Sequence, residues 1–329
     1  MKGEKLLLSI GLTIFLPMFL LLCVEEFIEA QKLDNWDGLV WSTTEQDTSS
    51  IRAGIDEDKR VSLLLQDGTI MEMSIESYLV GVLLEEMPAD FDEQALMAQA
   101  IAARTYALKT IGSGLKHSQG MLCDDHSCCQ GYCDKEKYLA AGGSRFSVEK
   151  MESVVNETKS LVLFYDGKLI DATYFSCSGG MTEAAEAVWG EDIAYLQAVE
   201  SPGEEASEYF TESTIISREE FQMLIGQQLD IYPENWFGQI TYTQGGGVDT
   251  IEIGGKQYQG TELRSILNLR STAFSISGVG EAIIITTKGF GHRVGMSQYG
   301  AEAMAVQGAS YEEILSYYYP GTSIETFVG

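Results

Sequence analysis

Two groups of residues have types and spacings that can support chemistry. The first is the acidic pair Glu85 and Glu86, directly before Met87 and Pro88. The second is the stretch KHSQGMLCDDHSCCQGYCD, which contains four of the six cysteines and two of the three histidines of the chain. A carboxylic acid in an apolar setting can act as a general acid. Thiols and imidazoles together are the ligand types of a zinc site.

The acidic pair must lie at the end of a helix. Apolar residues from Tyr78 to Leu83 recur at helical intervals, and Pro88 disfavours helix for the residue before it. The spacing therefore predicts a helix that ends near Glu86. Because neighbouring helical side chains point about 100° apart, only one of the two glutamates is expected to face a given cleft. Two solvated carboxylates at a helix end are the alternative interpretation.

A second helix is expected to follow the loop 88–91. Asp90 and Glu93 have the spacing of a capping box, and Gly112 is a suitable end. Its interior is rich in alanine, so a neighbouring backbone can approach closely. Arg104 lies within it.

The cysteine cluster has two interpretations. Disulfide bonds are expected in an exported protein. However, Cys128 and Cys129 are adjacent and cannot easily pair with each other, and two histidines accompany the thiols. The ligand types favour a metal, but the spacing is not that of paired CxxC motifs.

Hairpins and further helices are expected around these groups. Asp67-Gly68, Asp166-Gly167 and Gly254-Gly255 are turn signals between apolar runs, and the residues 161–175 are interpreted as one hairpin. Ser217 with Glu220 and Ser310 with Glu313 predict capped helices, the first through about Leu229, and 282–287 predicts a buried strand. Residues 244–248 are expected to be a flexible connector. The fold class expected is α+β, with helices and antiparallel hairpins around a deep cleft.

The start of the chain predicts a membrane anchor. The 19 residues from Leu6 to Val24 carry no charge and would span roughly 28 Å as a helix. Lysines before this segment place the N-terminus inside the cell. A cleaved signal peptide is the competing interpretation, since Ile28-x-Ala30 is a weak cleavage site. The expected domains are an anchor at 1–25, an extracytoplasmic tether at 26–59 and a catalytic domain at 60–329.

Charge limits the classes of partner. The formal net charge of −28 argues against nucleic acid, because phosphates would be repelled. A neutral or locally charged glycan remains compatible with it.

Three motifs in order resemble one family. They are YLVGVLLEEMP with the following alanine-rich helix, YFSCSGGMTEAAEAVWG, and GFGHRVGMSQYGA with the later YYPGT. Together they are similar to the stage II sporulation protein D family of enzymes that cleave cell-wall glycans. One departure is Arg293, which stands where the family has glycine.

The resemblance implies an activity and a site. It implies a membrane-anchored lytic transglycosylase that cleaves the bond between N-acetylmuramic acid and N-acetylglucosamine during engulfment in sporulation. It implies Glu86 as the catalytic acid and zinc bound by His117, Cys123 and Cys129. The metal is expected to be mainly structural, because the reaction needs a proton donor and no metal hydroxide. His126, Cys128 and Cys133 are left as further ligands or disulfide partners. Glycan-binding residues are expected at Arg104, Tyr174, Ser176, Ser178, His292, Ser297, Gln298 and Tyr299.

The same resemblance suggests partners and alternatives. The expected partners are peptidoglycan glycan strands, the cell membrane and other engulfment proteins such as an amidase or endopeptidase. A non-catalytic module that binds glycan or stimulates an amidase is the alternative function. A zinc amidase or peptidase is disfavoured, because the sequence has no His-Glu-x-x-His motif.

Overall fold

The computed structural model describes residues 60–114, 116–117 and 120–327. Within these residues no helix is both long enough and apolar enough to cross a membrane. The expected anchor and tether lie outside the described residues.

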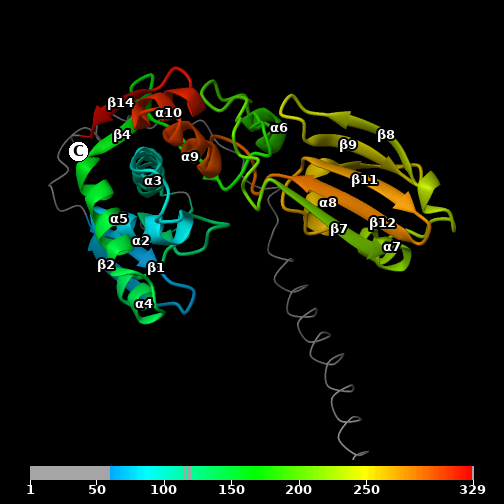
Figure 1. Cartoon of the computed structure of the whole chain (residues 1–329), viewed down its shortest axis with the longest axis horizontal. Helices are drawn as coiled ribbons and strands as arrows, with labels where there is room; N and C mark the ends of the chain where they lie inside the picture. The colour runs from blue at the N-terminus through cyan, green and yellow to red at the C-terminus, as the bar shows by residue number, and fades with distance from the viewer. Residues whose placement is uncertain (1–59, 115, 118–119, 328–329) are drawn as a thin grey trace, which may run out of the picture. The chain divides into compact units, whose positions relative to one another are not determined.

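The first hydrophobic core is built around one helix. Helix α3 (Glu93–Ser113) contacts α2 (Ile75–Glu86), α5 (Arg145–Glu157), α9 (Gln298–Val306) and α10 (Tyr311–Tyr318) (Figure 1). Its alanines, including Ala98 and Ala102, are fully buried. Small side chains let the surrounding backbones approach on several sides, which explains why this helix is enclosed rather than amphipathic.

Short strands complete this core. Strands β1 (Arg60–Leu64) and β2 (Ile70–Ser74) form the hairpin predicted at Asp67-Gly68, and β1 also pairs with β3 (Leu122–Cys123). Strand β4 (Leu161–Tyr165) pairs with β5 (Lys168–Leu169) and with β14 (Ser323–Thr326). Helix α4 (Lys135–Ala140) packs against α2.

The interpretation of residues 161–175 as one hairpin was wrong in its second half. The return strand ends at Leu169, and β6 (Tyr174–Phe175) pairs in parallel with β13 (Met296–Ser297) instead. This pairing places the loop that follows Phe175 beside the C-terminal motif. Helix α6 (Ala185–Trp189) follows in the chain.

Residues 211–288 form a second hydrophobic core. One antiparallel sheet contains β7 (Thr211–Ser217), β12 (Ala282–Lys288) and β11 (Phe274–Val279). The other contains β8 (Phe237–Tyr242), β9 (Val248–Ile253) and β10 (Lys256–Gln259). They enclose apolar residues such as Trp236, Ile251 and Ile283 together with α7 (Arg218–Ile225), α8 (Gly260–Ile266) and the 3-10 helix η3 (Pro233–Asn235). Figure 1 shows this second core in yellow-green to orange.

Local signals predicted most element ends, with several corrections. The capping box of Ser310 and Glu313 and the end of α2 at Glu86 are confirmed. Helix α3 is capped by Asp92 rather than Asp90 and continues through Gly112 to Ser113, with Gly114 as its C-cap. Helix α7 ends at Ile225, before Gly226. Residues 244–248 are an ordered turn between β8 and β9, not a flexible connector. The α+β fold class is confirmed.

Candidate active site and metal cluster

Glu86 is the last residue of α2 and is held by two distant segments. Its Oε1 accepts a hydrogen bond from the backbone N–H of Gly131 at 2.7 Å, and its Oε2 accepts one from Gln298 Nε2 at 3.3 Å. The side chain is half-buried, whereas Glu85 is exposed. The structure therefore gives the two glutamates different surroundings, as helix geometry predicts.

The surroundings of Glu86 favour its neutral form. Burial raises the pKa of this carboxyl group, and the hydrogen bonds from Gly131 and Gln298 oppose that change only in part. Met87 and Phe91, which follow in the loop, are 3% and 8% exposed and supply apolar surface. A raised pKa keeps a larger share of a carboxyl group protonated at a given pH, as a general acid requires.

The loop between Glu86 and α3 is held by side chains from two other helices. Lys150 Nζ from α5 donates to the carbonyls of Ala89 at 3.0 Å and Phe91 at 2.6 Å. The carboxylate of Glu302 on α9 accepts from the N–H of Asp92 at 2.6 Å. Two helices from different parts of the chain thus hold the segment that carries the candidate acid.

Tyr174 lies in a polar chain beside Glu86. Its hydroxyl accepts from Gln130 Nε2 at 2.7 Å, and Gln130 Oε1 accepts from the hydroxyl of Tyr78 at 3.0 Å. Burial, followed by the charge of Glu86, raises the pKa of Tyr174 well above its usual value. Tyr174 therefore stays a neutral group near the carboxylate.

The C-terminal motif delivers Gln298 to this site. Ser297 caps α9 by accepting from the N–H of Gly300 at 3.2 Å, and its hydroxyl donates to the Ser176 carbonyl at 3.4 Å. This cap starts the helix at Gln298, so the amide faces Glu86. Ser297 itself is fully buried. Its role in the structure is to position Gln298, which corrects the expectation that it faces a glycan.

His292 is packed between aromatic rings. Its ring lies 5.7 Å from Phe175 and 5.3 Å from Trp189 between centroids. Burial and the charge of Arg264 lower the pKa of His292 to about 4, so the ring is neutral at physiological pH. Its Nδ1 accepts from the N–H of Val294 at 3.1 Å, which leaves the proton on Nε2.

Arg293, which stands where the family has glycine, is buried and makes several hydrogen bonds. Its backbone is left-handed, with φ of 66°, and its side chain is 2% exposed. The guanidinium donates to the carbonyls of Ser178 at 2.8 Å, Met181 at 2.7 Å and Gly245 at 2.6 Å, and lies 3.4 Å from Glu183. It connects the C-terminal motif to the turn between β8 and β9.

The Ser-Gly-Gly loop is organised by a buried carboxylate. Glu204 Oε2 accepts from the hydroxyl and the N–H of Ser178 at 2.9 and 2.8 Å, and from Cys177 Sγ at 3.1 Å. Ser178 is fully buried, so its expected contact with a glycan was wrong. Ser176 is half-buried in the same loop, and its carbonyl accepts from the N–H of Tyr299 at 3.0 Å.

Arg104 is also internal. It is 1% exposed, pairs with Glu76 at 2.8 Å and donates to the carbonyls of Val155 and Leu161 at 3.2 and 3.3 Å. These partners belong to α2, α5 and β4, so Arg104 ties α3 to its neighbours. The expectation that it lines a cleft with Glu86 was wrong.

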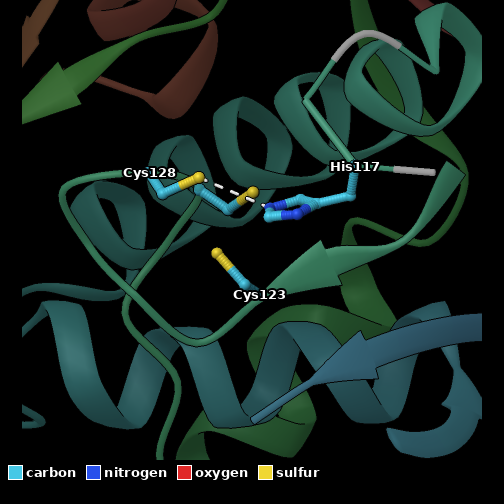
Figure 2. Close-up of side chains that lie close together, drawn as sticks. His117, Cys123 and Cys128 are labelled. Atoms are coloured by element: carbon cyan, nitrogen blue, oxygen red, sulfur yellow. Dashed lines mark hydrogen bonds between the residues drawn. The ribbon is translucent and has the colours of Figure 1, made fainter. Parts of the chain in front are cut away.

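The cysteine and histidine stretch converges on one point. Ligand atoms of His117, Cys123, Cys128 and Cys129 all lie within 4.8 Å of one another. Figure 2 shows the His117 ring directed toward Cys128, with Nε2 and Sγ 3.4 Å apart, and the Cys123 thiol directed toward the same space. The cysteines in the described residues are free thiols, and Cys133 lies outside the cluster. Cys128, which the sequence leaves as an open alternative, therefore lies with the three expected ligands.

This donor set fits a zinc ion. Zinc in structural sites prefers four ligands, with thiolate and imidazole the commonest, and three thiols with one imidazole match that preference. The ligand segment is also adjacent to the candidate acid, because Gly131 follows Cys129 by two residues and binds Glu86. A Cβ atom at position 131 would lie 3.0 Å from Glu86 Oε1 and 2.8 Å from Glu85 Cγ, so any larger residue would displace these two side chains.

Comparisons with known proteins agree with the motifs. A family model described as "Stage II sporulation protein" (SpoIID) matches residues 66–165. The chain is 40% identical to stage II sporulation protein D of Bacillus amyloliquefaciens, over 78% of this chain and 75% of that protein. It is 38% identical to the Bacillus subtilis protein of the same name, over 78% and 76% of the two chains, respectively. A Bacillus subtilis amidase enhancer is 28% identical, over 76% of this chain and 40% of that protein. The chain therefore belongs to the stage II sporulation protein D family.

Proposed function

We propose that this sporulation protein is a lytic transglycosylase of peptidoglycan with Glu86 as its general acid and base. The observation that carries the proposal is the state of Glu86: a half-buried carboxyl group with a raised pKa, held by Gly131 and Gln298. Gln298 belongs to the most distinctive motif of the chain. A surface glutamate of no function would need neither contact.

The chemistry requires one carboxyl group. Neutral Glu86 would donate its proton to the glycosidic oxygen as the bond from C1 of N-acetylmuramic acid to that oxygen breaks. The carboxylate would then accept the proton of the muramyl 6-hydroxyl as O6 bonds to C1. The products are a 1,6-anhydro end and a free 4-hydroxyl on N-acetylglucosamine, and no water is consumed. Hydrolases that use water need a second carboxylate, which this site does not require.

Zinc would support this site rather than react in it. We propose that it is bound by His117, Cys123 and Cys129, as the family resemblance implies, with Cys128 as the fourth ligand. Bound zinc would supply folding energy by crosslinking a segment that has little regular structure. Four protein ligands leave no open position for substrate. The ligand loop then fixes the Gly131 N–H that holds Glu86.

The expected location is the outer face of the cytoplasmic membrane. We propose that residues 1–25 anchor the chain and that residues 60–329 act on the wall outside. This proposal rests on the uncharged segment from Leu6 to Val24 and on the lysines before it. Other engulfment proteins, such as an amidase or endopeptidase, are the partners expected there.

Product analysis tests the reaction directly. Purified full-length chain is incubated with isolated sacculi, and the soluble fragments are identified by mass spectrometry. Anhydro-muramyl ends are expected, and they should be absent with the Glu86→Gln variant. Reducing muramyl ends would indicate hydrolysis instead, and unchanged glycan would refute enzymatic cleavage.

A second function is favoured by one relative. The similarity to an amidase enhancer suggests that the chain could stimulate a wall amidase without cleaving glycan itself. The same digestion with an added amidase separates the two functions. Stimulation that persists in the Glu86→Gln variant, without anhydro products from the unaltered chain, would support the second one.

A further inference from the structure

Four aromatic rings form a continuous row that begins at the Glu86 loop. Phe91, in that loop, contacts Tyr299 with ring centroids 5.1 Å apart. Tyr299 contacts Tyr209 at 5.6 Å, and Tyr209 contacts Phe290 at 5.5 Å. Three separate segments of the chain supply these rings. The row therefore leads away from the candidate acid toward residues that the sequence motifs did not indicate as binding groups.

Phe290, at the far end of the row, is exposed yet rigidly held. Its side chain is 41% exposed. The flanking Gly289 and Gly291 have φ of 76° and 115°, conformations that other residues rarely adopt. Their N–H groups donate to the carbonyls of Phe210 at 2.9 Å and Arg270 at 3.0 Å. The backbone thus fixes a large apolar ring at the surface, where it gains little by burial.

Charged groups of both signs flank the row, with Glu208 next to Tyr209 in the chain and Arg270 close to two of the rings. The Arg270 guanidinium lies 5.5 Å from the Tyr209 ring centroid and 5.7 Å from that of Phe290. Arg270 is paired with Glu212 at 2.8 Å, so its charge is balanced locally. In a chain with a net charge of −28, this surface suits a neutral ligand with an apolar face.

We propose that Tyr299, Tyr209 and Phe290 form an aromatic platform for a glycan strand. The rings would contact the C–H faces of N-acetylhexosamine units beyond the bond cleaved at Glu86. Two observations favour this ligand. The platform is continuous with the loop that follows Glu86, because Tyr299 contacts Phe91 with ring centroids 5.1 Å apart, and a sugar ring offers an apolar face without charge. This inference rests on the proposed function for the identity of the site, but it concerns binding rather than cleavage.

The test measures binding in the absence of cleavage. The full-length chain with Glu86→Gln is titrated calorimetrically with the β-1,4-linked dimer and hexamer of N-acetylglucosamine. Adding Phe290→Ala should weaken hexamer binding about tenfold, the loss expected for one apolar ring contact, and affect the dimer less. Phe290→Trp should retain hexamer binding, whereas Phe290→Leu should not. Phe146→Ala, at a ring that is 73% exposed on α5, is the matched control and should change nothing.

The two substitutions separate stacking from packing. Leucine preserves apolar volume without a flat ring, so hexamer binding by Phe290→Leu equal to that of phenylalanine would overturn the platform. Equal losses for dimer and hexamer, or no hexamer binding before Phe290 is changed, would also overturn it. Thermal unfolding of each variant identifies any that fails to fold. Weaker binding by Phe290→Ala, with no anhydro products from the unaltered chain, would refute the proposed cleavage and leave the platform standing.

Discussion

Replacing Glu86 by glutamine removes proton transfer while changing little else. The glutamine oxygen can still accept from the Gly131 N–H, at the 2.7 Å seen for Glu86. In the structure, Gln298 Nε2 lies 3.3 Å from Glu86 Oε2. The amide nitrogen of the variant would replace that oxygen, and rotation of the Gln298 amide would turn the Gln298 oxygen toward it as an acceptor. Both contacts therefore survive as neutral hydrogen bonds, and the variant should fold.

The expected effects on rate and stability differ in size. Loss of a general acid lowers the rate about 10²- to 10⁴-fold, equivalent to roughly 3–5 kcal/mol of activation free energy. Exchanging charge-assisted for neutral hydrogen bonds costs on the order of 1 kcal/mol. Against this cost, glutamine avoids burying a charge. Because the folded-state pKa of Glu86 is raised, ionisation of this group removes stability as pH rises from the ordinary value of 4.5 to the raised value.

Two assays check this reasoning. Release of anhydro-muramyl fragments from sacculi should fall by at least a hundredfold in Glu86→Gln, and Glu85→Gln should retain nearly full activity because that side chain is exposed. Thermal unfolding at neutral pH should show Glu86→Gln to be about as stable as the unaltered chain or more so. Any stability advantage should vanish as pH falls below the ordinary glutamate value of 4.5. An active Glu86→Gln enzyme, or an inactive Glu85→Gln enzyme, would refute the assignment.

Three further predictions concern the surroundings of Glu86. Cleavage by the unaltered chain should decline as pH rises through the raised pKa of Glu86, because only the protonated form can donate a proton. A pH–rate profile measures this decline. A rate that increases across that range would contradict the acid role. Gly131→Ala should reduce the rate about tenfold or more, because the added methyl group would lie 3.0 Å from Glu86 Oε1 and displace the carboxylate. A rate equal to that of the unaltered chain would show that the position of the carboxylate is not critical. The purified chain should contain about one zinc by elemental analysis. Both Cys128→Ser and His117→Ala should lower the metal content and the melting temperature. Stoichiometric disulfides without metal would show that these residues do not bind zinc.

Local chemistry made the helix ends and turns predictable. Ser310 with Glu313 and the Asp67-Gly68 turn act within a few residues, so their effect is visible in the sequence. The cap of α3 is Asp92 and not Asp90, although both residues are suitable by type. The N–H of Asp92 is also held by Glu302, a residue 210 positions away. Long-range contacts of that kind decide between competing local signals, and the sequence alone does not show them.

The candidate site was predictable in part for the same reason. The motifs identified Glu86 and Gln298, but only the fold shows that they are hydrogen-bonded partners. Ser178 and Arg104 had suitable residue types, yet each satisfies a buried internal partner. Gly131 could not be identified from the sequence, because a single glycine does not reveal that its backbone lies close to another residue.

The buried Arg293 has a consequence for how the protein unfolds. Its left-handed backbone costs about 1–2 kcal/mol, which glycine would avoid. In return, its guanidinium bridges Ser178 and Met181 in the first core region to Gly245 in the turn of the second. The two cores should therefore melt in a single cooperative transition. Arg293→Gly would relieve the backbone but leave Glu183 buried without its cation, and calorimetry should then resolve two transitions where the unaltered chain shows one.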